Sequence, residues 1–473
     1  MKIRFLLMNA YAPGGTVTTT FAMAGALAAK KHDVEIISVY RRRRSDPLKS
    51  PPAGVPIRVL LDLREDRPVQ APSGRADRAK DRVRTWLEEQ PSRLVPREEI
   101  RYPNFSLRTD LALMRFLRSF DEGVLVSTRP ALNIITARFG RRSAVKVGQE
   151  HMYLLKHEAE IIDHITKSYG RLDAVAALTQ RDADDFVRAL GPGVRVVAIP
   201  NAVPPRQGVR ASLQEKVVLA AGRNSYQKGW NFLIAAFAVL AREHPDWVLR
   251  MFTVGSEENM QALLQRISEH GLDGRVEVKG YTQSLEKEMG RASIYALSSR
   301  YEGFPMVLLE AMAAGLPPVA FDCPNGPAEL IDDGRNGIVV PLGDAEALGR
   351  GFVALADDEE LRRSMGAAAV ETAAGYDLAT TADRWEQLFD ELLAEKAGTK
   401  RRSWGPRTRG GRIGQIAPTA EQQRLAQAKA QAKARKKAQA AAAAGAAAPA
   451  AAAAQPAPLS RPDQPGPAPR RGV

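Results

Sequence analysis

The sequence predicts an α/β protein with two successive domains, each built from a parallel β-sheet with helices on both faces. The chain has 473 residues, more than one ordinary hydrophobic core organises. Short apolar runs alternate with helix-like stretches, which is the pattern of parallel sheets. The alternation stops at the proline-rich residues 200–210 and then starts again, so we expect two domains of similar construction.

The first half begins with a buried strand at residues 3–9, a loop with two adjacent glycines and a helix of small residues that ends near Lys31. Residues 41–110 then interrupt the alternation, because arginine and proline are frequent there. We expect them to form an irregular basic insertion around one strand at residues 57–61. The other strands of this half are expected at residues 34–40, 124–127, 144–147, 174–178 and 194–199.

The second half repeats the pattern, with a helix expected at residues 231–243 and an amphipathic helix at residues 378–396. Its strands are expected at residues 217–221, 248–254, 276–278, 294–297, 318–321 and 338–340. Two Rossmann-like units in tandem would face each other across a central cleft. The expected boundaries are a first domain at 1–200, a linker at 201–215, a second domain at 216–375 and a C-terminal helix at 376–396.

The net charge of +14 is concentrated in one segment. Residues 396–473 hold sixteen basic and two acidic side chains, so residues 1–395 are neutral as a whole. From residue 397 the composition changes to arginine and glycine, then to alanine, lysine and glutamine, and finally to alanine and proline. Such a segment cannot bury enough apolar surface to offset the entropy of ordering, so we expect a disordered basic tail at 397–473.

Within the neutral part, residues 41–120 hold nineteen basic and eleven acidic side chains. This local excess favours an anionic partner, either lipid headgroups or an acidic polymer; the alternative is a solvated, salt-bridged insertion. The single cysteine, Cys323, suits a reducing cytosol. No apolar stretch approaches the ~18 residues of a spanning helix. We therefore expect a cytoplasmic protein, and peripheral association with the inner face of the cell membrane is one of the two alternatives for the basic segment.

The segment from Glu302 to Glu310 carries the strongest functional signal. Pro305 suits the first position of a helix, and Gly315 suits the position just after its end. Glu302 is then expected on a loop at the carboxyl end of a strand, and Glu310 in the helix that follows. The carboxyl ends of parallel strands bind ligands, and a helix N-terminus presents N–H groups to an anion such as a diphosphate.

A second signal follows the first strand of the second domain. Arg223 and Lys228 share a short loop that begins at Gly222 and ends at Gly229. Arginine offers phosphate oxygens a planar fork and lysine a point charge, and a departing diphosphate needs such fixed positive partners. We expect alanine at either cation to lower turnover ~10²-fold or more and to leave the melting temperature nearly unchanged.

Together these elements resemble the family 4 retaining glycosyltransferases, which have the GT-B fold. The resemblance rests on the Gly-Arg…Lys-Gly loop, on Glu302 and Glu310 with Gly-Phe-Pro after the first of them, and on the stretch from Asn325 to Glu329. The Pro-Gly-Gly loop at residues 13–15 also matches. The resemblance covers roughly residues 1–395, strongly in the second domain and weakly over residues 41–120.

The resemblance implies a role for each residue of the site. Arg223 and Lys228 would hold the donor diphosphate, Glu302 would contact hydroxyls of the donor sugar, and Glu310 would accept hydrogen bonds from the ribose. His151 follows an expected strand and would contact the donor sugar, although a structural loop histidine fits the sequence equally well. The implied donor-binding residues are Gly14, Gly15, Gly222, Gly280, Tyr281, Gly303, Phe304, Leu308 and Glu310, with Gly280 and Tyr281 beside the base.

The implied reaction is transfer of a sugar from a nucleotide-diphosphate donor, a UDP-sugar, to an acceptor hydroxyl with retention of configuration. No metal and no cofactor are expected, in keeping with a metal-independent family. The acceptor would be a sugar, a lipid-linked acceptor or an anionic polymer, in the synthesis of cell-envelope polysaccharide, glycolipid or teichoic-type polymer. No carboxylate pair is placed as a glycoside hydrolase requires.

Three alternatives remain. A GT-B sugar-nucleotide epimerase would share both domains and the diphosphate site but would need no acceptor. A Rossmann oxidoreductase is disfavoured, because no Gly-x-Gly-x-x-Gly follows an early strand. A non-enzymatic alternative is a nucleic-acid or membrane-surface binder driven by the tail. Trp404 is the tail's single aromatic residue, so no specific nucleic-acid recognition is expected.

Overall fold

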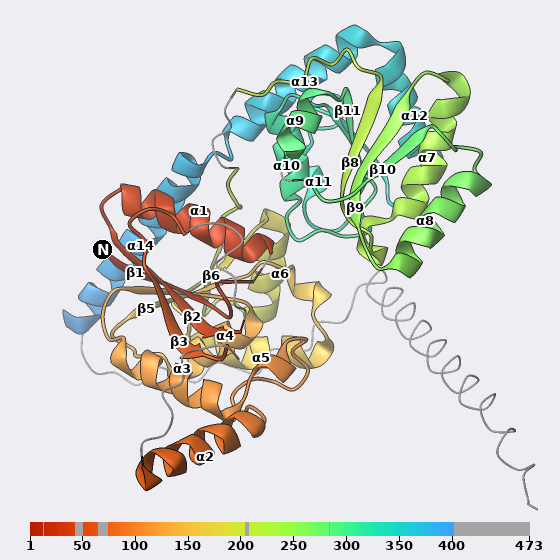
Figure 1. Ribbon diagram of the computed structural model, residues 1–473. Helices are drawn as coiled ribbons and strands as arrows, with labels where there is room; N and C mark the ends of the chain where they lie inside the picture. Colours follow the sequence, from red (N-terminus) through yellow and green to blue (C-terminus); the bar gives the residue numbers. More distant parts are fainter. Residues whose placement is uncertain (13, 43–50, 65–73, 204–207, 283, 402–473) are drawn as a thin grey trace, which may run out of the picture. The chain divides into compact units, whose positions relative to one another are not determined.

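The computed structural model describes residues 1–401 apart from residues 13, 43–50, 65–73, 204–207 and 283 (Figure 1). The expected disordered tail lies outside the described residues from residue 402 onward. Two parallel sheets are present, and each has helices on both of its faces. The predicted α/β class is therefore confirmed. The expected domain and linker boundaries stay predictions.

The first sheet has seven strands in the order β3-β2-β1-β4-β5-β6-β7. The strands are β1 (Lys2–Leu7), β2 (Asp33–Arg41), β3 (Ile57–Asp62), β4 (Val124–Thr128), β5 (Val145–Gln149), β6 (Ala174–Ala177) and β7 (Arg195–Ala198). Adjacent residues of β4 pack on opposite faces: Val124 and Val126 join one buried cluster and Leu125 another. A strand buried on both faces has a continuous apolar run, which is the pattern in the sequence.

The helices of this half differ in how many of their residues are buried. They are α1 (Gly15–Ala29), α2 (Arg75–Glu89), α3 (Leu107–Ser119), α4 (Pro130–Phe139), α5 (Ala159–Ser168) and α6 (Gln180–Leu190). Helix α4 buries eight consecutive residues from Pro130 to Ala137. Helix α3 begins at a capping box, in which Ser106 and Thr109 exchange side-chain-to-backbone hydrogen bonds.

The second sheet has six strands in the order β10-β9-β8-β11-β12-β13. The strands are β8 (Val217–Arg223), β9 (Val248–Val254), β10 (Val276–Lys279), β11 (Ile294–Leu297), β12 (Pro318–Asp322) and β13 (Ile338–Pro341). The helices are α7 (Trp230–Glu243), α8 (Glu257–Glu269), α9 (Leu285–Gly290), α10 (Met306–Ala313), α11 (Pro327–Leu330), α12 (Ala345–Asp357) and α13 (Glu359–Ala374). All six strands expected from the apolar runs are present, with ends that differ by at most two residues.

Both sheets reverse their strand order beside the first strand of each series. The chain moves outward from β1 through β2 to β3 and then returns to place β4 on the other side of β1. It does the same around β8, with β9 on one side and β11 on the other. Loops diverge at such reversals, so the carboxyl ends of β1 and β4, and of β8 and β11, are the expected binding edges.

The last described helix, α14 (Leu378–Arg401), packs on the first sheet rather than on the second, which precedes it in sequence. Trp385 and Phe389 are buried in one cluster with Ile3 and Phe5 of β1. On the surface, Lys30 pairs with Glu386 at 2.6 Å. The helix begins where its periodicity predicts and ends five residues later than expected, at Arg401. Its apolar stripe is long enough to be predicted, but its packing partner is set by tertiary structure.

The prediction of an irregular insertion at residues 41–110 is wrong in part. The strand is present as β3, but residues 75–89 form the four-turn helix α2. The helix was missed because the prediction followed the high arginine and proline content of this region, although small and apolar residues recur at helical spacing within residues 75–89. The segment after it is fixed by the buried carboxylate of Asp110, which accepts hydrogen bonds from the Ser92 hydroxyl at 2.7 Å and from the Arg93 backbone at 2.7 Å.

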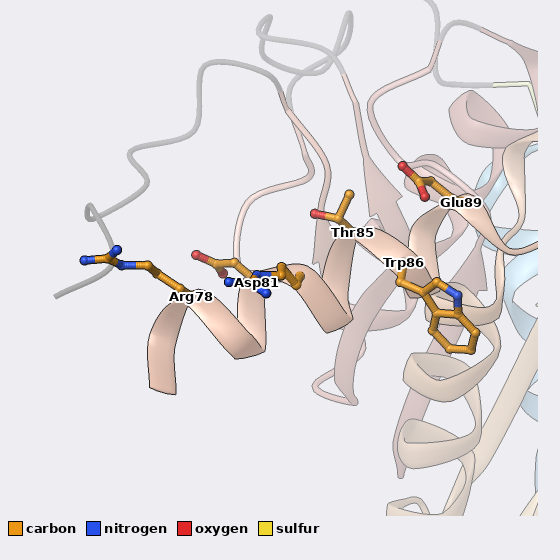
Figure 2. Close-up of a pocket in the computed structure, with 6 residues that line it drawn as sticks. Arg78, Asp81, Thr85, Trp86 and Glu89 are labelled. Atoms are coloured by element: carbon orange, nitrogen blue, oxygen red, sulfur yellow. The ribbon is translucent and has the colours of Figure 1, made fainter. Parts of the chain in front are cut away.

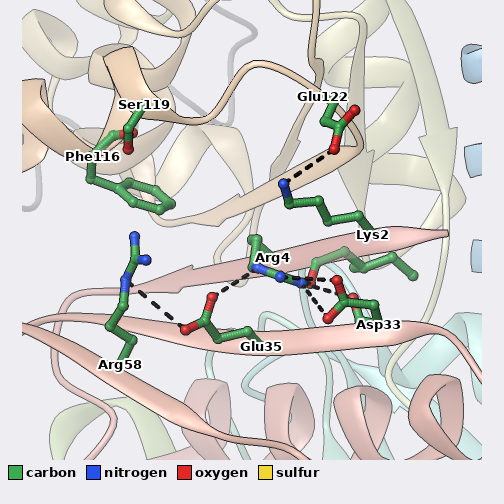
Figure 3. Close-up of polar contacts among 9 residues, drawn as sticks. Lys2, Arg4, Asp33, Glu35, Arg58, Phe116, Ser119 and Glu122 are labelled. Carbon is green, nitrogen blue, oxygen red and sulfur yellow. Dashed lines mark hydrogen bonds and ion pairs between the residues drawn. The ribbon is translucent and has the colours of Figure 1, made fainter.

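Charged side chains bind β1, β2 and β3 together near their starts (Figure 3). Arg4 on β1 pairs with Glu35 on β2 at 2.8 Å and donates hydrogen bonds to Asp33. Arg58 on β3 lies 4.0 Å from Glu35, with its guanidinium 5.2 Å from the centre of the Phe116 ring. This network lies away from the carboxyl ends of the strands, so it supports the sheet rather than the binding edge.

Candidate functional site

Lys228 and Glu302 form an ion pair at the carboxyl edge of the second sheet. The Lys228 Nζ lies 2.8 Å from the Glu302 Oε1. The same oxygen accepts a hydrogen bond from the Ser299 hydroxyl at 2.6 Å, and the other oxygen accepts one from the Gln227 amide at 3.4 Å. Glu302 is only 6% exposed. The carboxylate is thus held in place by a cation and two neutral donors, and both charges are within reach of one ligand.

Glycines surround this pair because side chains would not fit. A Cβ atom at Gly222 would lie 2.6 Å from the Lys228 Cε, so glycine allows the lysine side chain to cross β8 on its way to Glu302. A Cβ at Gly326 would lie 2.5 Å from the Cδ of Pro305. Gly229 has a φ of 62° and its Cβ would lie 2.2 Å from a backbone oxygen. These glycines fix the positions of Lys228 and Glu302.

Helix α10 begins directly after the loop that carries Glu302. Pro305 is its N-cap and not its first residue, so the helix begins one residue later than the sequence indicates, and no side chain caps it. Gly315 follows the last turn with a φ of 86°, which confirms the expected C-terminal glycine. Phe304 and Leu308 are buried in the core, so any contact of theirs with a donor would come from backbone atoms. Glu310 lies in α10, as expected.

The remaining residues expected at the donor lie at the ends of strands or helices. Arg223 is the last residue of β8 and is exposed. Gly14 caps α1 with a φ of 153°, and Gly15 is the first residue of that helix. Gly280 and Tyr281 follow β10, and the Tyr281 side chain is 80% exposed. An aromatic ring that is so exposed is available to stack on a nucleotide base.

In the first domain, His151 follows β5, is half-buried and lies near the positive charge of Arg129. Burial and, to a smaller extent, the positive charge of Arg129 lower the pKa of His151 to about 4. The ring is therefore neutral at pH 7, and its Nε2 atom has no hydrogen-bond partner among the described residues. Arg129 pairs with the buried Glu99 at 3.0 Å. Its φ of 91° is uncommon for a non-glycine residue and is typical of functional sites.

Glu150, directly before His151, is fully buried between two donors. Its Oε1 accepts hydrogen bonds from the Asn133 amide at 2.7 Å and from the Tyr169 hydroxyl. Burial raises the pKa of Glu150 to about 8, and these hydrogen bonds act in the opposite direction. Its carboxyl group is therefore mainly protonated at pH 7. Glu150 therefore supplies no full negative charge to offset the positive environment of His151.

Several contacts connect residues of the first and second halves of the chain. A Cβ atom at Gly303 would lie 2.8 Å from the backbone oxygen of His151. The Glu329 carboxylate accepts hydrogen bonds from the backbone N–H groups of Gln180 and Arg181, at 2.9 and 3.0 Å, and so caps helix α6. His151 and Gly303 lie far apart in the sequence and belong to no common motif, and the fold brings them together.

Three residues near the expected site were not predicted from the sequence. Ser299 could have been noticed, because it follows β11 in a Ser-Ser pair at a strand's carboxyl end. Arg129 had no signal beyond the proline after it, and Glu99 had none. Among the described residues, His, Cys, Asp and Glu side chains form no group of three that could hold a metal ion. The expected metal independence remains a prediction.

An open hollow elsewhere on the surface lies on helix α2 (Figure 2). It contains none of the residues expected at the donor site. The lining residues are Arg78, Asp81, Arg82, Thr85, Trp86 and Glu89. This hollow is therefore a separate feature of the first domain.

Residues 206–372 match the family described as "Glycosyl transferases group 1". The chain is 34% identical over 406 residues to an exopolysaccharide phosphotransferase of Streptomyces coelicolor, a match that covers 85% of this chain and 42% of the relative. It is 28% identical over 305 residues to the amylovoran biosynthesis glycosyltransferase AmsD of Erwinia amylovora, covering 62% and 85%. A poly(glycerol-phosphate) alpha-glucosyltransferase of Bacillus subtilis is 26% identical over 227 residues, covering 47% and 33%.

Solved structures share the fold over most of the chain. A sucrose-phosphate synthase of Thermosynechococcus elongatus superposes with a TM-score of 0.64 at 18% identity, covering 83% of this chain and 99% of that one. A TarM variant of S. aureus, in complex with UDP among other ligands, superposes with a TM-score of 0.65 at 13% identity, covering 82% and 100%. The chain therefore has the GT-B fold. Together with the family match, the fold supports a GT-B glycosyltransferase of group 1.

Proposed function

We propose that this chain is a family 4 glycosyltransferase that moves a sugar from a UDP-sugar to an acceptor hydroxyl with retention of configuration. The observation that carries the proposal is the Lys228–Glu302 pair, held at 2.8 Å between fixed glycines at a sheet's carboxyl edge. A diphosphate would accept hydrogen bonds from the Lys228 ammonium. The Glu302 carboxylate, released in part from the lysine, would accept hydrogen bonds from the sugar hydroxyls.

The other residues take the roles that this placement allows. Arg223 would add a second cation to the diphosphate, and Glu310 would accept hydrogen bonds from the ribose. The glycines at residues 14 and 15 would meet the diphosphate from the first domain, and Tyr281 would stack beside the base. His151 is neutral, so it can donate or accept one hydrogen bond at the sugar without placing a charge there.

The chemistry follows from these charges. The acceptor oxygen bonds to the anomeric carbon while the bond from that carbon to the diphosphate oxygen breaks, and the electron pair of the broken bond leaves with the diphosphate. The hydroxyl proton passes to that departing group on the same face of the sugar, which retains the configuration. Lys228 and Arg223 stabilise the charge that develops on the diphosphate. No metal is required for this assignment of roles.

We propose an anionic polymer as the acceptor, in cell-envelope or teichoic-type polymer synthesis. Burial raises the pKa of Tyr40, while the positive charges of Arg42, Arg129 and Arg101 oppose that shift. Three cations from separate segments therefore lie around the carboxyl end of β2. The name of the Bacillus subtilis relative, a poly(glycerol-phosphate) alpha-glucosyltransferase, also agrees with a polyanionic acceptor.

The donor assignment is tested by thermal denaturation of the purified full chain with UDP-, GDP- and ADP-sugars. A donor at about a hundred times its dissociation constant stabilises a protein by about 2.7 kcal/mol. We expect UDP-sugars to raise the melting temperature and the others to have little effect. If no nucleotide sugar stabilises the chain, the proposal is wrong. Donor turnover to a new sugar nucleotide without acceptor would instead identify an epimerase.

The chain spans 42% of the length of the Streptomyces relative, whose name states a phosphotransferase activity. Transfer of a phosphosugar instead of a sugar is therefore a second candidate. The two reactions release different nucleotides: a glycosyltransferase releases the nucleoside diphosphate, whereas a phosphosugar transferase releases the monophosphate. Chromatography of the released nucleotide decides between them, and release of the monophosphate alone would exclude the glycosyltransferase.

A further inference from the structure

Helix α2 is an exposed helix whose small and apolar side chains, apart from the half-buried Leu87, are exposed. It spans Arg75–Glu89, and none of its residues is buried. Trp86 is 54% exposed and Val83 is 55% exposed. A helix of this length is marginally stable in water unless one face packs on something. A surface helix normally turns its apolar face to the core, so the orientation of α2 is inverted.

The side chains of α2 are sorted by type around the helix. With about 100° between successive residues, the small and apolar side chains fall within one arc of about 100°. These residues are Ala76, Ala79, Val83, Trp86 and Leu87. Cations flank the arc on both sides: Arg75, Arg78 and Arg82 on one, and Lys80 and Arg84 on the other.

The acids lie mainly on the opposite side, toward the protein. Glu88 pairs with Arg108 of helix α3 at 2.7 Å, and Asp77 and Asp81 are half-buried. Within α2, Asp77 and Asp81 pair with Lys80 and Arg84. Glu89, at the last turn, lies beside the arginine flank, and Asp81 lines the same hollow as Arg78 and Arg82. The acidic side of α2 thus holds the helix on the domain and leaves the apolar arc and the arginines outward.

We propose that α2 docks on an anionic membrane surface, with Trp86 and Val83 inserted at the headgroup boundary. An apolar arc flanked by cations, with acids opposite, is the arrangement of helices that lie in a membrane interface. Arg78, Arg82 and Trp86 line the same open hollow, together with Asp81, Thr85 and Glu89 (Figure 2). A second copy of the chain would bring five cations against five, which opposes pairing of this face with itself.

This assignment is independent of the donor and the acceptor. No helix among the described residues is long and apolar enough to cross a bilayer, so any membrane contact there would be peripheral. The basic tail would also attract anionic vesicles, but without an apolar face its attraction is electrostatic. Insertion of Trp86 is the property that separates docking by α2 from attraction by the tail.

The test uses full-length chains and vesicles of phosphatidylcholine, with or without half phosphatidylglycerol. In flotation assays at 150 mM salt we expect Trp86→Asp and Val83→Asp each to lower binding to anionic vesicles about tenfold. Leu264→Asp is the matched control, because Leu264 is 52% exposed on helix α8, and it should bind like the wild type. The tail is identical in all of these chains, so its contribution cancels.

A second measurement reports insertion directly. In a Trp404→Phe background, brominated lipid should quench fluorescence of the chain with Trp86 and should have little effect after Trp86→Phe. Wild-type binding by Trp86→Asp, or absence of quenching, would overturn the proposal. A stable dimer in solution that Trp86→Asp dissociates would also overturn it and would assign α2 to self-association.

Discussion

The two domains hold their functional charges in different ways. In the second domain, the Glu302 carboxylate is matched by the Lys228 ammonium at 2.8 Å and by the Ser299 hydroxyl. In the first domain, Glu150 is buried and His151 is half-buried, neither has a charged partner in contact, and burial shifts their pKa values to about 8 and about 4. Pairing keeps a group charged, whereas burial makes it neutral. The carboxyl edge of the second domain thus holds an ion pair, whereas His151 and Glu150 of the first domain are neutral.

The largest expected effect concerns the paired cation. Lys228→Ala and Arg223→Ala should each lower turnover ~10²-fold or more, because each removes a positive charge from the departing diphosphate. The exposed Lys216, which pairs with Asp246, provides the control, and Lys216→Ala should retain activity. Wild-type kinetics in Lys228→Ala would show that the pair does not serve the donor.

The stability of the same two variants against unfolding should distinguish the paired cation from the exposed one. The sequence alone indicates no loss of stability for either cation. The ion pair revises this for Lys228, because Lys228→Ala leaves the buried Glu302 carboxylate without its cation and should cost more than about 1 kcal/mol. Arg223 is exposed, so Arg223→Ala should leave the denaturation midpoint unchanged. Equal midpoints for the two variants would contradict this distinction.

Glu302→Gln and Glu310→Gln should fail in different ways. Glu302→Gln should lower turnover roughly 10- to 100-fold and leave binding of bare UDP nearly intact, since its expected contact is with the sugar. Glu310→Gln should weaken bare UDP roughly tenfold, since a ribose contact is present with or without the sugar. Calorimetric titration with UDP measures both. Equal losses of affinity in the two variants would refute the division of roles.

His151 tests whether burial keeps the first domain neutral. Because its pKa lies near 4, its ring signals in histidine-labelled NMR spectra should not titrate between pH 5.5 and 8. Removal of the ring in His151→Ala should lower turnover about tenfold, the effect of one lost hydrogen bond to the sugar. A midpoint near pH 6.5 for this ring would show that it is solvated, and the contrast between the domains would be lost.

Glu150 gives the smallest effect and the clearest sign. Its folded pKa of about 8 is raised above the value of about 4.5 in the unfolded chain, so the unfolded state loses its proton first. Its contribution to stability is complete below pH about 4.5 and is lost as pH rises toward 8. Glu150→Gln keeps the acceptor oxygen and cannot ionise. It should therefore stabilise the chain by about 1–3 kcal/mol at pH 7 and by almost nothing at pH 4.

Chemical denaturation of both proteins at the two pH values measures this difference. The matched control is Asp173→Asn, a carboxylate that pairs with Lys396 at 3.0 Å and whose loss should not stabilise the chain at pH 7. A gain from Glu150→Gln that is equal at pH 4 and pH 7 would show that the effect is one of packing and that the carboxyl group is not held neutral.

The sequence by itself determined the α/β class, the strands of both sheets and the position of Lys228 and Glu302 at the carboxyl edge of the second sheet. These features are local: an apolar run specifies a strand buried on both faces, and Lys228 and Glu302 stand beside glycines whose missing side chains leave room for them. Each of these features can therefore be predicted from a short stretch of sequence.

Only the tertiary structure decided which distant segments meet. It placed α14 on the first sheet, Gly303 beside His151, and Arg129 beside Glu99. It also buried Glu150, which no composition or spacing indicates, and turned the apolar arc of α2 outward. The physical reason is that burial and the charge of a neighbour belong to the packed molecule. They shift a pKa or expose a helix face through residues that are remote in the sequence.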